Sequence, residues 1–97
     1  MHLVDVTNSY RRMVENQLAA TSAQQIRVYS LGNTTAIYSK SRRHNDIVLS
    51  NKERKVRDQE IEFVIDQLMP EVDREKLRIK QTEKRRVIDI TERKEIS

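Results

Sequence analysis

Residues 26–39 decide the fold, and they read IRVYSLGNTTAIYS. Both arms of this stretch are rich in β-branched and aromatic residues, and Gly32-Asn33 separates them. A glycine at the first position of a two-residue turn supplies the positive φ that a type II′ hairpin turn requires. The stretch therefore predicts a β-hairpin in which Val28 lies opposite Ile37, and Arg27 lies opposite Tyr38.

This register gives the predicted hairpin two different faces, because successive side chains of a strand point to opposite sides. One face carries Ile26, Val28 and Ile37, which we expect to meet the core. The other face carries Arg27, Tyr29, Ala36 and Tyr38. We expect Tyr29 and Tyr38 to lie on the face away from the core, where they form either a stacking site for a ligand or a packed interface.

The chain before the hairpin predicts a strand and a helix. Leu3–Val6 is a short apolar run typical of a strand. Thr7-Asn8-Ser9 offers three possible N-cap side chains, and the helix behind them is expected to end near Thr21-Ser22. Its apolar stripe consists of Tyr10, Met13, Val14 and Leu18.

The chain after the hairpin predicts a strand, a helix and another strand. Asp46–Leu49 is the next apolar run, and Ser50 with Glu53 has the spacing of a capping box. A long amphipathic helix is expected from there to Pro70. Leu77–Lys80 alternates apolar and basic residues, as a half-buried strand does.

The order of these elements predicts an α+β fold. We expect a mainly antiparallel sheet of four to five strands with two amphipathic helices on one face, and the split β-α-β arrangement of ferredoxin-like folds is one topology that fits. Residues 1–80 are predicted to form a single domain. Residues 81–97 are predicted to be a charged C-terminal tail that either adds a strand or stays outside the sheet.

Composition excludes several classes of function. Leu, Ile, Val and Phe make up 25 of the 97 residues, which is above the roughly 20% needed for a packed core. One glycine rules out the glycine-rich phosphate loops, and the lack of cysteine rules out disulfides, thiol catalysis and cysteine-ligated zinc. The two histidines, His2 and His44, lack metal-ligand spacing. We therefore predict no catalytic residues, no metal and no cofactor, in a protein that is not an enzyme.

The N-terminal and apolar patterns predict a cytoplasmic protein. No apolar run follows a basic start, as it would in a signal peptide. No run approaches the roughly 20 apolar residues that span a bilayer, so no membrane partner is expected.

The net charge of +4 is unevenly distributed along the chain. Residues 40–57 hold seven cations and two acids, whereas the charged residues of 58–73 are all acidic. A basic loop next to the tyrosines would suit single-stranded nucleic acid. The alternative is a solvated surface whose cations pair with nearby acids, for example Arg54 with Asp58. The candidate nucleic-acid-binding residues are Lys40, Arg42, Arg43, His44, Lys52, Arg54, Lys55 and Arg57.

Three stretches carry a resemblance to a known family: Val6–Tyr10, Val14–Leu18 and Val28–Thr35. The sequence resembles a family of small bacterial proteins of unknown function from lactic-acid bacteria and related low-GC Gram-positive bacteria. The resemblance implies a cytoplasmic bacterial protein with no assigned activity, and it transfers no functional residue.

Two functions remain as hypotheses. The first is a protein-interaction or regulatory module that binds a protein partner or self-associates through the hairpin or an unpaired edge strand, because exposed strand edges readily pair with another chain. The second is a protein that binds RNA or DNA through residues 40–57.

Overall fold

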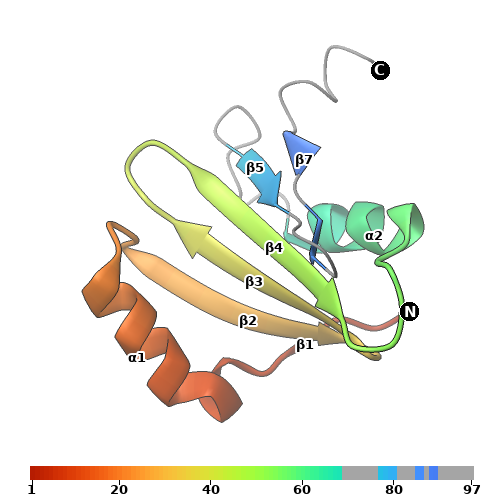
Figure 1. Ribbon diagram of the computed structural model, residues 1–97, viewed down its shortest axis with the longest axis horizontal. Coiled ribbons are helices and arrows are strands. Elements are labelled where there is room, and N and C mark those ends of the chain that lie inside the picture. The colour runs from red at the N-terminus through yellow and green to blue at the C-terminus, as the bar shows by residue number, and fades with distance from the viewer. Residues whose placement is uncertain (69–76, 81–84, 87, 90–97) are drawn as a thin grey trace.

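An antiparallel meander forms the centre of the fold (Figure 1). The computed structural model describes residues 1–68, 77–80, 85–86 and 88–89. Neighbouring strands of the meander pair in the order β1-β2-β3-β4. The four strands are β1 (Val4–Asp5), β2 (Gln25–Leu31), β3 (Thr34–Lys40) and β4 (Asn45–Asn51).

The predicted hairpin is confirmed in its register and in the positive φ of its glycine. Val28 pairs with Ile37, and Arg27 pairs with Tyr38. Gly32 has a φ of 58° and open space where a Cβ would lie. The turn therefore requires glycine for its backbone conformation and not for close packing.

Three further strands extend the sheet beyond β4. The predicted strand β5 (Leu77–Lys80) is present and runs parallel to β4. Two short strands follow within the predicted tail: β6 (Arg85–Arg86) pairs with β4, and β7 (Ile88–Asp89) pairs with β5. The tail thus contributes strands to the sheet. Pro70, where we expected the second helix to stop, lies outside the described residues.

The two helices cover opposite faces of the sheet (Figure 1). A 3₁₀ turn, η1 (Thr7–Tyr10), leads into α1 (Arg11–Ala20), and α2 (Asp58–Leu68) follows β4. Val14 of α1 packs on Ile26 and Val28. The larger cluster lies under α2 and contains Tyr29, Leu31, Ala36, Tyr38, Ile47, Leu49, Val56, Ile61, Val64, Ile65 and Leu68.

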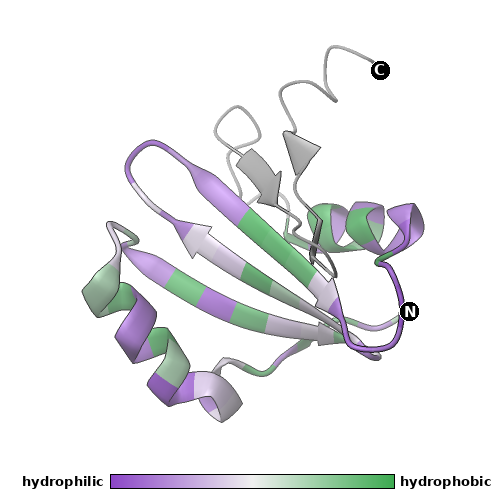
Figure 2. Ribbon diagram, viewed as in Figure 1, coloured by the Kyte–Doolittle hydropathy of each residue, from purple (hydrophilic) through white to green (hydrophobic). Residues whose placement is uncertain are grey.

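The α+β class and the order of the elements are as predicted, but two details of arrangement differ. We expected both helices on one face, whereas each face of the hairpin carries large apolar side chains and each has its own helix. Figure 2 shows the alternation of apolar and polar residues along β2. The strand order also differs from a ferredoxin-like one, because β1 pairs antiparallel with β2 and the strands from β1 to β4 are neighbours in chain order.

The second helix starts later than the capping-box pattern predicted. Ser50 lies within β4, because the strand continues to Asn51. The Asn51 side-chain oxygen then accepts hydrogen bonds from the backbone N–H groups of Glu53 and Arg54, at 2.9 and 3.1 Å. This local turn ends the strand, and α2 begins only at Asp58.

Candidate functional site

The eight candidate nucleic-acid-binding residues fall into two groups at opposite ends of β4. Lys40, Arg42, Arg43 and His44 belong to the β3–β4 connection, and Lys52, Arg54, Lys55 and Arg57 to the β4–α2 connection. β4 has seven residues and a strand rises about 3.3 Å per residue, so the groups lie about 20 Å apart. The fold separates residues that are neighbours in sequence. Nucleic-acid binding by these residues stays a prediction.

Within the first group, a tight loop exposes two arginines. The Ser41 backbone N–H donates to the His44 carbonyl at 2.9 Å, and the His44 N–H donates to the Ser41 hydroxyl at 3.2 Å. Arg42 and Arg43 lie at the tip of this loop and are exposed. These bonds fix a compact turn that presents both guanidinium groups to solvent.

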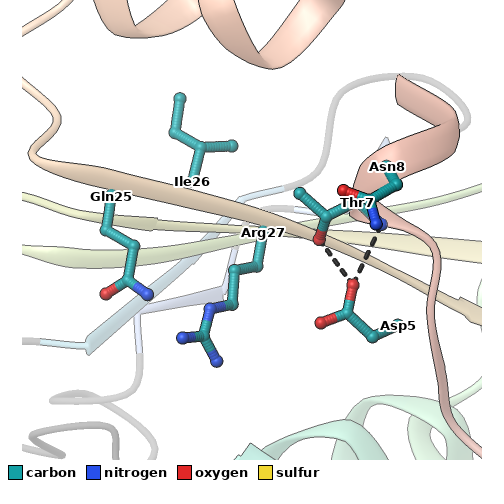
Figure 3. A pocket seen from close by; sticks show the side chains of 6 residues that line it. All are labelled: Asp5, Thr7, Asn8, Gln25, Ile26 and Arg27. Carbon is teal, nitrogen blue, oxygen red and sulfur yellow. Dashed lines mark hydrogen bonds between the residues drawn. The ribbon is translucent and has the colours of Figure 1, made fainter. Parts of the chain in front are cut away.

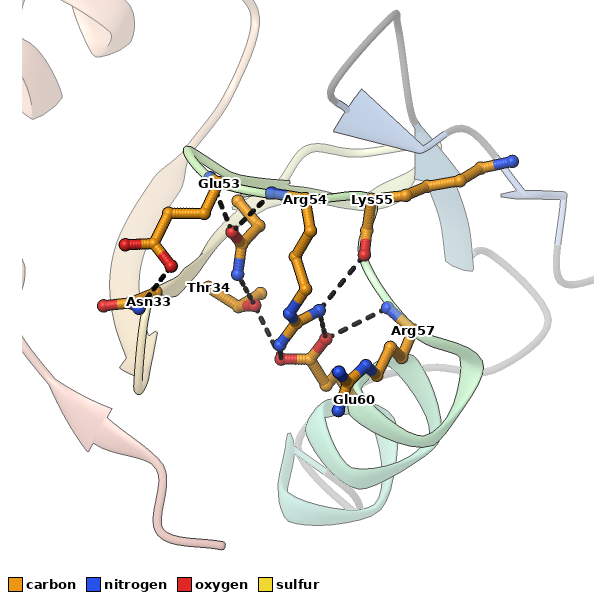
Figure 4. A network of polar contacts seen from close by, with 8 residues as sticks. Asn33, Thr34, Glu53, Arg54, Lys55, Arg57 and Glu60 are labelled. Carbon is orange, nitrogen blue, oxygen red and sulfur yellow. Dashed lines mark hydrogen bonds and ion pairs between the residues drawn. The ribbon is translucent and has the colours of Figure 1, made fainter.

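In the second group, Arg54 forms an ion pair with the buried carboxylate of Glu60 (Figure 4). Two of its guanidinium nitrogens donate to the two carboxylate oxygens, at 2.7 and 3.1 Å. The alternative partner predicted from the sequence was Asp58, one helical turn after Arg54. Because the helix begins only at Asp58, Arg54 lies in the preceding connection and reaches Glu60 instead.

Glu60 is the centre of a buried polar network. Its carboxylate also accepts from the Thr34 hydroxyl at 2.6 Å and from the Arg57 backbone N–H at 3.0 Å. The bond from Arg57 caps the first turn of α2. The Asn51 amide completes the network by donating to the Thr34 hydroxyl at 2.9 Å.

The ion pair with Arg54 lowers the pKa of Glu60 to about 2, and the bonds from Thr34 and Arg57 act in the same direction against the effect of burial. In the described part of the chain, every buried side-chain nitrogen and oxygen has a hydrogen-bond partner. The network is therefore internally satisfied, and it joins the hairpin, the β4–α2 connection and α2. We interpret it as a structural element.

The two tyrosines are not displayed at the surface, contrary to the sequence-based expectation. Tyr29 and Tyr38 do share the face predicted for them, but α2 covers that face. Only 8% of Tyr29 and 4% of Tyr38 remain exposed. Their rings pack in the core and do not offer a stacking surface to a base.

A different feature, missed in the sequence, lies at the edge of the sheet. β2 has seven residues, but β1 pairs only with its Tyr29 and Ser30. Beyond these, the Val6 backbone N–H donates to the Val28 carbonyl at 2.8 Å. The Thr7 hydroxyl then accepts from the Val28 N–H at 3.0 Å and lies 2.6 Å from the Asp5 carboxylate. After this side-chain cap the chain leaves the sheet through η1.

Beyond the point where Thr7 contacts it, the edge of β2 therefore has no strand beside it among the described residues. Backbone groups of alternate residues face the same side of a strand, so the N–H and C=O of Ile26 point the same way as those of Val28. A pocket of about 440 Å³ lies at this place. It is lined by Asp5, Thr7, Asn8, Gln25, Ile26 and Arg27 (Figure 3).

Polar side chains are fixed around this pocket. The Gln25 amide lies beside the Arg27 guanidinium, and with its oxygen toward that group it would accept hydrogen bonds at 2.8 and 2.9 Å. The Thr7 hydroxyl and N–H donate to the Asp5 carboxylate and lower its pKa, and the charge of Arg27 adds to this effect. Figure 3 shows the Ile26 side chain pointing toward α1, so its backbone is the part that faces the pocket. We name residues 25–27, with Asp5 and Thr7, the β2 edge site.

No helix in the described residues is long and apolar enough to cross a membrane. Across the same residues, no group of three or more His, Cys, Asp or Glu side chains is placed to hold a metal ion.

The family model for a domain of unknown function, DUF1827, matches residues 1–92. The chain belongs to this family. The resemblance noted in the sequence is thereby confirmed. No curated protein matches the chain.

A solved structure agrees with the family assignment. It is the crystal structure of a conserved protein of unknown function from Streptococcus thermophilus, a lactic-acid bacterium. The two chains are 32% identical, with a TM-score of 0.72, over 77% of this chain and 75% of the other. The similarity extends over most of both chains, and it assigns no activity to the family.

Proposed function

We propose that this protein acts by binding another protein through the β2 edge site. One observation carries the proposal: β2 has seven residues, but β1 pairs with only two of them. An open strand edge offers main-chain donors and acceptors to an extended segment of another chain. The adjoining pocket leaves room for that segment.

The fold supports this use of the edge. β3 is paired on both sides, with β2 and with β4, so the hairpin itself offers only the outer side of β2. Ile26 is 5% exposed and is held under α1 by Val14. The edge is thus presented by a strand that the core fixes in place, which reduces the entropy lost when a partner binds.

Site-specific photo-crosslinking in the native host tests the proposal. A photoreactive amino acid at Gln25 is expected to trap a protein partner, whereas the same group at Gln17, on the exposed side of α1, should trap much less. Light scattering of the purified protein at rising concentration shows whether that partner is a second copy. A strict monomer with no protein crosslinks at Gln25 above the Gln17 level would contradict the proposal.

A matched pair of substitutions separates main-chain pairing from side-chain contact. Both Ile26→Pro and Ile26→Ala replace the Ile26 side chain with a smaller one, but only proline removes the N–H that faces the pocket. We expect Ile26→Ala to retain the crosslinked partner and Ile26→Pro to lose it. Equal loss in both variants, with the fold intact by circular dichroism, would show that strand pairing is not the mode of binding.

A further inference from the structure

A positively charged loop that the proposed function does not use lies at one end of the sheet. We name residues 40–44, which end β3 and lead into β4, the basic loop. Figure 1 shows it at the same end as the α1–β2 connection, and the Gln24 N–H of that connection donates to the Lys40 carbonyl at 2.7 Å. Residues 16–45, which include both connections, contain no Asp or Glu. The basic loop therefore has an uncharged neighbour on this side.

The cations of the basic loop are available to a ligand. Lys40, Arg42 and Arg43 are exposed. In the described part of the chain, their side chains form no ion pair or hydrogen bond. The first acid after the loop, Asp46, is half-buried within β4. An incoming anion would thus meet three cations that no carboxylate of the described residues already holds.

The cations at the other end of β4 are in a different position. Residues 52–60 hold four cations and three acids, whereas the basic loop holds three cations and no acid. The Arg54 guanidinium is bound to the Glu60 carboxylate at 2.7 Å. The Asn33 amide donates to Glu53, whose carboxylate adds a further negative charge near Arg54. Of the two basic groups that β4 separates, the basic loop is therefore the one that attracts a polyanion.

We propose that the basic loop binds the phosphate backbone of a nucleic acid. Guanidinium groups bind phosphate oxygens with two parallel hydrogen bonds. A nucleic-acid strand carries a charge at every nucleotide, so Arg42 and Arg43 can each contact a phosphate. The hydrogen bonds between Ser41 and His44 already fix the backbone of the loop, which reduces the entropy lost on binding. This activity is separate from the proposed protein binding, which uses the outer edge of β2.

The loop binds the backbone without reading the bases. It contains no Phe, Tyr or Trp, and Tyr29 and Tyr38 are buried under α2. These rings are therefore not available for the stacking that holds single-stranded bases. Phosphate contacts alone carry no sequence information, and their strength depends steeply on salt. We expect weak binding that is independent of sequence.

Fluorescence anisotropy of labelled DNA with the full-length protein tests the proposal. The probes are a duplex and a single strand of equal length, each in two unrelated sequences, titrated at several salt concentrations. We expect both sequences to bind equally and all binding to weaken as salt rises. For the duplex, Arg42→Gln combined with Arg43→Gln should weaken binding and make the log–log salt dependence shallower by about 1.8, which is about 0.9 for each lost phosphate contact.

Two further double variants assign the effect to the loop and to its charge. Lys52→Gln with Lys55→Gln removes the same charge from two exposed side chains at the other end of β4, and it should change the salt dependence little. Arg42→Lys with Arg43→Lys keeps the charge of the loop and should keep most of the salt dependence. Circular dichroism confirms the fold of each variant.

Each remaining outcome would overturn the proposal. Wild-type protein that binds neither probe at low salt, where attraction is strongest, has no such site. Equal weakening in the two glutamine double variants would mean that the net charge of +4, and not the basic loop, attracts the DNA. A glutamate homopolymer of the same charge that binds as tightly as the DNA would identify an acidic protein segment as the ligand instead.

Discussion

Replacing Ile61 with alanine is expected to lower the free energy of unfolding by about 2–5 kcal/mol. Ile61 is completely buried and lies in the cluster between α2 and the sheet face that carries Tyr29 and Tyr38. Removing its side chain loses apolar contacts and leaves a cavity in the larger of the two clusters. Urea denaturation followed by circular dichroism measures the change.

Leu18→Ala on α1 is the matched comparison. Leu18 is half-buried and packs at the margin of the smaller cluster, where Val14 is the one buried residue of α1. We therefore expect a clearly smaller loss of stability from this change. A loss as large as that of Ile61→Ala would mean that α1 is packed as deeply as α2, which contradicts the two unequal clusters.

Acid is expected to destabilise the protein through Glu60. The pKa of Glu60 is about 2 in the folded protein and 4.5 in the absence of its partners. A lowered pKa means that the folded state favours the ionised carboxylate. Its contribution is therefore complete above about pH 5 and is lost as the pH falls toward 2. At about 1.4 kcal/mol per pK unit, the loss from this group is at most about 3.5 kcal/mol.

Glu60→Gln tests this assignment. The variant should be less stable than the wild-type protein at pH 7, and its stability should fall less steeply between pH 5 and pH 2, as measured by urea denaturation at each pH. Glu15→Gln removes the same charge from an exposed ion pair with Arg11, so it should change stability little. If stability falls equally steeply between pH 5 and pH 2 in the wild-type protein and in Glu60→Gln, other groups control the acid sensitivity.

The hairpin could be predicted in detail because its information is local. The only glycine lies where the turn needs a positive φ, and the alternation in both arms fixes the register of Val28 with Ile37. The sequence could not show which face α2 covers, because both faces of the hairpin carry apolar side chains. The exposure expected for Tyr29 and Tyr38 depended on that choice.

The candidate site depended on distances that the sequence does not contain. Lys40 and Lys52 look like members of one basic segment until β4 places them at its two ends. The sequence indicates the β2 edge site only weakly. β1 is two residues long because the Thr7 hydroxyl, and not a further strand residue, accepts the hydrogen bond from the Val28 N–H. An Asp-x-Thr sequence directly after a short apolar run is the pattern that could have indicated such a cap.

Hydrogen exchange of the β2 amides in dilute, monomeric protein tests the open edge most directly. The N–H of Val28 donates to the Thr7 hydroxyl, whereas the N–H of Ile26 faces the pocket. We predict that the Ile26 amide exchanges much faster than that of Val28, although the Ile26 side chain is buried. No strand of the described residues pairs with this side of Ile26, and an amide without a hydrogen-bond partner has little protection. Protection of the Ile26 amide equal to that of Val28 in the monomer would show that the edge is already covered, and it would contradict the β2 edge site.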